Sequence, residues 1–97
     1  MSNINATRDG FSVVVGLGPG LVKLPAGTEF ASDALLDNRG NADAYIKFGQ
    51  ADVTVNQATG VRVPAGAIVP ITKGAATHMA HVGDGATTLM LHFGSGD

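Results

Sequence analysis

Glycine and proline interrupt this chain so often that an α-helix of ordinary length has almost nowhere to form. The 97 residues include 14 glycines and 4 prolines. A helix needs about ten residues free of both, with an apolar repeat near 3.6. The longest such run, Thr28 to Arg39, has room for one short helical turn over Phe30–Leu36. The core must therefore come from strands.

Alternating apolar and polar residues, typical of strands with one buried face, occur in three segments. The residues expected on the core face are Phe11, Val13, Val15 and Leu17; Ala44, Ile46 and Phe48; and Thr87, Leu89, Leu91 and Phe93. The shorter candidate strands are Leu21–Leu24, Ala34–Asn38, Asp52–Asn56, Gly60–Val63, Ala67–Ile71 and Thr77–Val82. Because Pro70 has no N–H to donate, we expect its strand at a sheet edge or at a bulge.

Residues that favour tight turns separate these strands. The turn segments are Gly18–Gly20, Pro25–Gly27, Asn38–Asn41, Pro64–Gly66 and Gly83–Gly85. Eight or nine short strands at this spacing predict an all-β fold, either a small antiparallel β-sandwich or a jelly-roll-like barrel. We expect a flexible N-terminal arm over residues 1–9 and a single β-sandwich domain over 10–97.

Charge and composition argue against several classes of partner. The six basic residues are scattered singly and the net charge is −2, whereas nonspecific nucleic-acid binding needs clustered Lys and Arg. No apolar stretch reaches the roughly 18 residues of a membrane span, and the first residues lack the pattern of a secretory signal. There is no cysteine for a disulfide or a thiolate site. We expect synthesis in a cytoplasm, with no nucleic-acid or membrane partner.

The three histidines do not form a convincing metal site. In a strand, His78 and His81 would point to opposite faces, and neither a cysteine nor a nearby acid joins them or His92. The arrangement compatible with them is an ion shared between subunits on a symmetry axis. We therefore expect no metal ligands within one chain.

No catalytic or cofactor motif is complete. Residues Gly16–Gly20 resemble a phosphate-binding loop but lack its Lys-Ser/Thr pair, and a short strand follows rather than a helix, so a turn is the better interpretation. Glu29, Asp33 and Asp37 could share a helical face, yet solvated charges or turn caps explain them better. No serine lies in a nucleophile elbow. We expect a chain that is not an enzyme and uses no cofactor.

Outward faces rich in small residues favour repeated protein contacts, and two places are candidates for a partner interface. The arm residues Ser2, Asn3, Ile4 and Asn5 could add to an exposed edge strand of a neighbour. Tyr45 is the aromatic residue expected to project outward, where it could serve an interface or fill a second core.

Three segments resemble short virion proteins of tailed bacteriophages. They are Asn38–Gly49, with the pattern N-x-G-x-A-D-A-Y-ϕ-x-F-G, then Val63–Gly66 and Gly74–His78. The matching stretch covers about residues 35–94, and Gly74–Thr77 has one alanine more than the pattern. The motifs are structural, so the resemblance implies a β-sandwich or jelly-roll subunit and carries over no functional site.

The resemblance implies a function in the particle. We expect a capsid decoration (cement) protein on the outer capsid surface, made in the host cytoplasm, which binds the major capsid protein as a homo-oligomer, with a trimer favoured. The alternatives are a head–tail connector, tail or fibre-associated subunit, and, from another class, a small ligand- or carbohydrate-binding sandwich.

Overall fold

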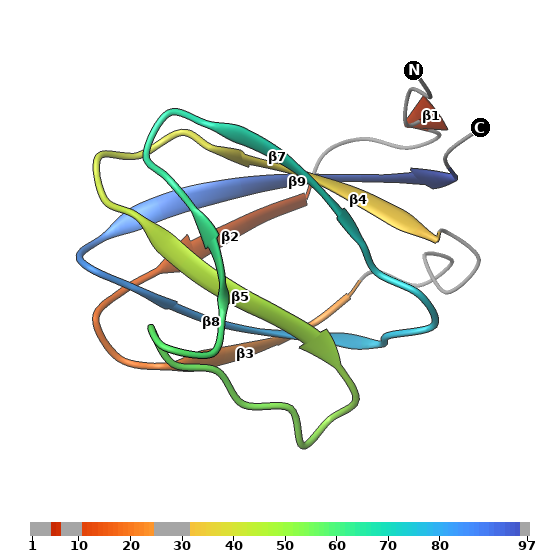
Figure 1. The fold of residues 1–97 in the computed structure, drawn as a ribbon, viewed down its shortest axis with the longest axis horizontal. Helices are drawn as coiled ribbons and strands as arrows, with labels where there is room; N and C mark the ends of the chain where they lie inside the picture. Colours follow the sequence, from red (N-terminus) through yellow and green to blue (C-terminus); the bar gives the residue numbers. More distant parts are fainter. Residues whose placement is uncertain (1–4, 7–10, 25–31, 96–97) are drawn as a thin grey trace.

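The computed structural model describes residues 5–6, 11–24 and 32–95, and within them it contains strands, turns and loops but no helix (Figure 1). The strands are β1 (Asn5–Ala6), β2 (Phe11–Val15), β3 (Gly20–Lys23), β4 (Asp33–Asn38), β5 (Ala44–Gly49), β6 (Val61–Val63), β7 (Ile68–Thr72), β8 (His78–Gly83) and β9 (Thr87–Ser95). All pairings are antiparallel and form two sheets, so the predicted all-β sandwich is confirmed.

The long strand β9 organises the first sheet, here called sheet A. Strands β2 and β1 pair along one side of β9, β4 pairs along the other, and β7 pairs with β4. Sheet B has the order β3-β8-β5-β6. Short turns join β2 to β3 and β6 to β7, so β2 and β3 end the two sheets on one side of the sandwich, and β7 and β6 end them on the other.

One apolar core lies between the sheets and takes side chains from both. Its buried members are Val13, Val15, Leu24, Ala34, Leu36, Ala44, Ile46, Val63, Met79, Leu89, Leu91 and Phe93. The period of two predicted most of these positions, because alternate residues of a strand face the same way. Phe11 and Phe48 pack against this core while remaining partly exposed.

Two of the predicted elements are wrong. The helical turn does not form over Asp33–Leu36, and the alternative strand Ala34–Asn38 is confirmed there as β4; Phe30 and Ala31 lie outside the described residues. Strand β4 lies between β7 and β9, and backbone hydrogen bonds from both sides hold it extended. The predicted strand Asp52–Asn56 is a loop, because Val53 and Val55 pack onto the outer face of sheet B instead of pairing with a strand.

A third correction concerns Leu17, which was expected on the core face. Strand β2 ends at Val15, the turn begins at Gly16, and Leu17 is 72% exposed. The apolar alternation therefore continues past the end of the strand. The Gly18–Gly20 turn signal marks this boundary better than the alternation does.

The prediction for Pro70 is confirmed, because β7 is an edge strand that pairs with β4 alone. Lys73 donates its N–H to the carbonyl of Ser32 (2.8 Å), so position 73 faces β4. Hydrogen-bonding positions alternate along an antiparallel pair, which places Pro70 among the residues that face away from β4. The missing N–H of Pro70 thus falls on the side of β7 where no described strand pairs.

Both ends of the chain contribute to sheet A. Asn5 pairs with Ser95, and Ala6 pairs with Gly94, beside the C-terminal end of β9 (Figure 1). The rest of the arm, residues 1–4 and 7–9, lies outside the described residues.

Candidate functional site

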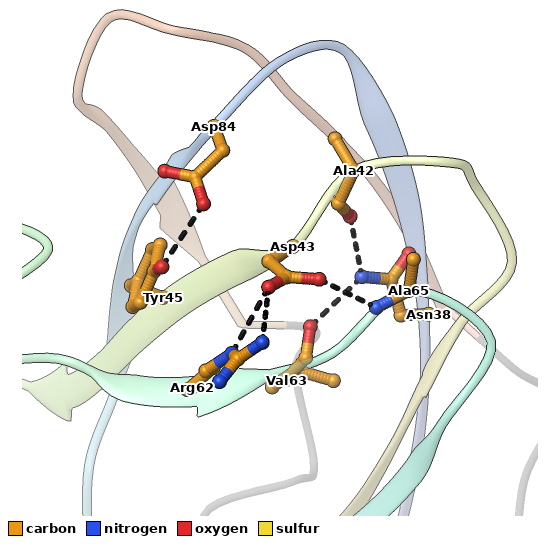
Figure 2. A network of polar contacts seen from close by, with 8 residues as sticks. All are labelled: Asn38, Ala42, Asp43, Tyr45, Arg62, Val63, Ala65 and Asp84. Atoms are coloured by element: carbon orange, nitrogen blue, oxygen red, sulfur yellow. Dashed lines mark hydrogen bonds and ion pairs between the residues drawn. The ribbon is translucent and has the colours of Figure 1, made fainter.

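Residues from two of the three segments that resemble bacteriophage proteins, Asn38–Gly49 and Val63–Gly66, take part in a network of polar contacts (Figure 2). Its centre is Asn38, the last residue of β4, which is fully buried. Asn38 Nδ2 donates to the carbonyls of Ala42 (2.8 Å) and Val63 (2.9 Å). Its Oδ1 accepts from the Gly40 N–H (3.1 Å) and the Thr87 hydroxyl (2.6 Å). All side-chain hydrogen-bonding capacity of this buried amide is used within the chain, so it joins the sheets rather than binding a ligand.

Gly40 allows the chain to pass close to β9 at this end. A Cβ at Gly40 would lie 2.7 Å from the Cα of Thr87, and the obstacle is main chain, which cannot swing away. The third residue of the motif is therefore glycine for a steric reason, and not because it must contact a ligand.

Asp43 connects β5 to the turn after β6. Its Oδ1 accepts the N–H of Ala65 (3.0 Å), while its Oδ2 lies 2.9 Å from Nε and 2.7 Å from Nη2 of Arg62. Ala67 donates its N–H to the carbonyl of Pro64 (3.0 Å), and φ of Gly66 is +79°, as in a type II turn. The Ala65 N–H and the Arg62 guanidinium lower the pKa of the Asp43 carboxyl, and the same carboxylate raises the pKa of Arg62.

Tyr45 lies on the outer face of sheet B, as predicted, but it is half-buried there. It packs with Val53 against Val55, Ala80 and Val82, which form a second small core under the loop that follows β5. Of the two roles that the sequence left open for Tyr45, an interface or a second core, this packing corresponds to the second core.

The Tyr45 hydroxyl makes a polar contact of its own, because it donates to Oδ2 of Asp84 (3.0 Å; Figure 2). That hydrogen bond to an anion raises the pKa of the phenol. No sequence pattern pointed to Asp84, which lies 39 residues away in a turn.

The other predicted interface residues lie at the N-terminus. Ser2, Asn3 and Ile4 are outside the described residues, and Asn5 opens β1. Their role in binding a partner stays a prediction, as does that of Tyr45.

The three histidines do not converge. His78 and His81 point to opposite faces of sheet B, as their spacing predicted, and His92 lies on the outer face of sheet A. Within residues 5–6, 11–24 and 32–95, no group of three His, Cys, Asp or Glu side chains could hold a metal. His81 is buried over Gly20, its Nδ1 has no hydrogen-bond partner, and burial lowers its pKa.

A shallow groove of about 430 Å³ lies where the loop after β5 passes the edge strand β3. Its lining is mainly apolar and comes from Pro19, Gly20, Leu21, Ala51, Asp52, Val53, Thr54 and Val55. The glycine-rich segment predicted to be a turn is the turn between β2 and β3.

The acidic residues considered for acid–base chemistry do not converge. Asp33 and Asp37 lie on β4 and face outward from sheet A; Asp37 pairs with Arg39 at 2.8 Å, and Glu29 is outside the described residues.

Comparison of the chain with protein-family models, with curated protein sequences and with solved structures gave no match. The described residues include no helix long and apolar enough to cross a membrane.

Proposed function

We propose that this chain is a capsid decoration subunit of a tailed bacteriophage, which binds the major capsid protein on the outside of the assembled shell. The proposal rests on the resemblance carried by Asn38–Gly49, Val63–Gly66 and Gly74–His78. The observation that supports it most is the placement of these motifs, since Asn38, Asp43 and Tyr45 hold the framework together (Figure 2). These motif residues therefore stabilise the fold, in keeping with a structural subunit.

The outer face of sheet A is the surface we assign to the shell. Its side chains are Ser12, Val14, Asp33, Leu35, Asp37, Ile68, Pro70, Thr72, Thr88, Met90 and His92. Val14 is 77% exposed and Ile68 is 58% exposed. On sheet B, in contrast, Val53 and Val55 cover part of the outer face. Of the side chains on the outer face of sheet A, the charged ones are Asp33 and Asp37, and a face with so few charges suits a broad contact with another protein.

Stabilisation of the shell would follow from mass action. A subunit that binds the assembled shell and not its separated parts stabilises the assembly by an amount that grows with its concentration relative to Kd. No catalytic group is needed for such a role. The hydrogen bonds of Asn38, Asp43 and Tyr45 would serve to stabilise the fold that presents the contact face.

The first test is the copy number of this chain in purified particles, measured by quantitative mass spectrometry against the major capsid protein. A number comparable with the capsid protein supports decoration. A handful of copies assigns the chain to a connector, tail or fibre instead, and absence from the particle overturns every virion role.

The second test locates the contact face. Purified chain is added to particles that lack it, and bound chain is measured after sedimentation. We expect Val14→Lys to weaken binding about tenfold or more, because a buried unpaired charge in an interface is strongly unfavourable. The control is Val61→Lys, since Val61 is 45% exposed but lies in β6 of sheet B. Equal binding of the two variants contradicts the assignment to sheet A.

A further inference from the structure

Strand β3 is an open edge of sheet B. It pairs with β8 on one side, and no described strand pairs with its other side. Leu24 donates its N–H to the carbonyl of Thr77 (2.9 Å), so position 24 faces β8. Hydrogen-bonding positions alternate, and the main-chain N–H and C=O groups of Leu21 and Lys23 therefore point away from β8. They can receive another strand.

The opposite side of the sandwich is protected against such pairing. On β7 the central outward position is Pro70, which has no N–H, and β6 is only three residues long. The side formed by β2 and β3 has no proline inside either strand. A partner strand would therefore add on the β2 and β3 side.

The sequence around β3 selects what can pair with it. Pro19 precedes the strand and Pro25 follows Leu24, so neither flank offers an N–H. Suppose that β3 pairs antiparallel with β3 of a second copy. In a register centred on Leu21, Lys23 of one copy would lie opposite Pro19 of the other. Pairing centred on Lys23 would bring two like charges face to face. In the register centred on Val22, Leu21 of each copy lies opposite Lys23 of the other copy. This is the one register that uses the outward N–H groups of Leu21 and Lys23 in both copies.

Charge favours the same register. Leu21 and Lys23 lie on the outer face of sheet B, and Leu21 lines the groove together with Asp52. With Val22 at the centre, Lys23 of the second copy would lie beside Leu21, in the groove that Asp52 also lines. Lysine on an edge strand usually discourages pairing, but here each lysine would meet an acid of the other copy.

We propose that a second copy of this chain docks on β3, forming a twofold dimer in which antiparallel β3 strands join the two copies of sheet B. Leu21 pairs with Lys23 of the other copy, and each Lys23 meets the Asp52 of the other copy across the groove. This inference goes beyond the proposed function and holds without it. It differs from the trimer that the bacteriophage resemblance implies.

The test is the mass of the purified full chain across a concentration series, by analytical ultracentrifugation. We expect the mass of two chains at high concentration. Lys23→Asp and Asp52→Lys should each weaken self-association by about tenfold or more, because two attractive pairs become repulsive. The double variant should restore the wild-type dimer. Lys47→Asp is the control, since it makes the same charge change on the same face of sheet B, on β5.

A second variant addresses the backbone directly. Leu21→Pro removes an N–H that faces the second copy and leaves the hydrogen bonds to β8 intact, so circular dichroism should show a folded chain that stays monomeric. A monomeric wild type, a trimer, or a dimer that the charge exchanges do not affect overturns the proposal. Self-association and particle copy number are separate measurements, so failure of one proposal leaves the other standing.

Discussion

The hydroxyl of Thr87 donates a 2.6 Å hydrogen bond to Oδ1 of Asn38, although the two residues are 49 positions apart in the chain. The bond joins the end of β4 to the start of β9, and Nδ2 of the same amide holds Val63 of sheet B. One buried side chain thus positions both sheets.

Replacement of Asn38 by alanine should destabilise the fold by about 3 kcal/mol, because several buried donors and acceptors lose their partner together. Urea unfolding followed by circular dichroism measures the change. Asn41→Ala, at an exposed position of the same turn, is the matched control and should change stability by less than about 0.5 kcal/mol. Similar stabilities for the two variants would refute the central role of Asn38.

Gly40→Ala should destabilise by about 2 kcal/mol or more, because the added methyl group overlaps the main chain of Thr87. Gly18→Ala is the control, since a Cβ at Gly18 has nothing within 4 Å. The comparison uses thermal unfolding of both variants. An unchanged melting temperature for Gly40→Ala would contradict the close approach.

Asp43 should make stability depend on pH on the acid side. Its pKa is lower in the folded chain than the ordinary 3.8, so the unfolded chain takes up a proton first as the pH falls. The stabilisation is present above about pH 4 and is lost as the pH falls through the folded value. Asp43→Asn should show a smaller loss between pH 5 and pH 2, measured by urea unfolding at each pH. An identical loss in both proteins would exclude Asp43 as the cause.

His81 should make stability fall from about pH 7 toward pH 5. Burial lowers its pKa, so below the ordinary value of 6.5 the unfolded chain binds the proton more readily than the folded one. His81→Leu replaces the imidazole with an apolar side chain that does not titrate, and should reduce this part of the pH dependence. The readout is the urea midpoint at the two pH values, and an unchanged difference would contradict the prediction.

The single tyrosine of the chain offers a spectroscopic test of the contact with Asp84. The phenol should ionise above its ordinary pKa of 10.0, because the Asp84 carboxylate accepts a hydrogen bond from the neutral hydroxyl and repels the phenolate. Asp84→Asn should lower the midpoint of the tyrosinate absorbance titration. Asp52→Asn, at an exposed acid on another loop, should leave it in place.

The strand pattern of this protein is local information, and the sequence alone predicted most of it. Alternation found the core faces of β2, β5 and β9, glycine and proline marked the turns, and Pro70 identified an edge. Each of these depends on the pleat or on one residue's own backbone chemistry. The same local reasoning predicted correctly that Tyr45 lies on the outer face of its sheet and that His78 and His81 point to opposite faces.

Contacts between distant segments were decided only by the tertiary structure. Residues 33–36 can form a helical turn or a strand, and pairing with β7 and β9 settled them as a strand. Val53 and Val55 alternate with polar residues as a strand would, yet they pack with Tyr45 on the outer face of sheet B and pair with no strand. The partners of Asn38 and the open edge of β3 depend on which strands become neighbours. Neighbours are selected by the packing of the whole core, a property that no short window of sequence contains.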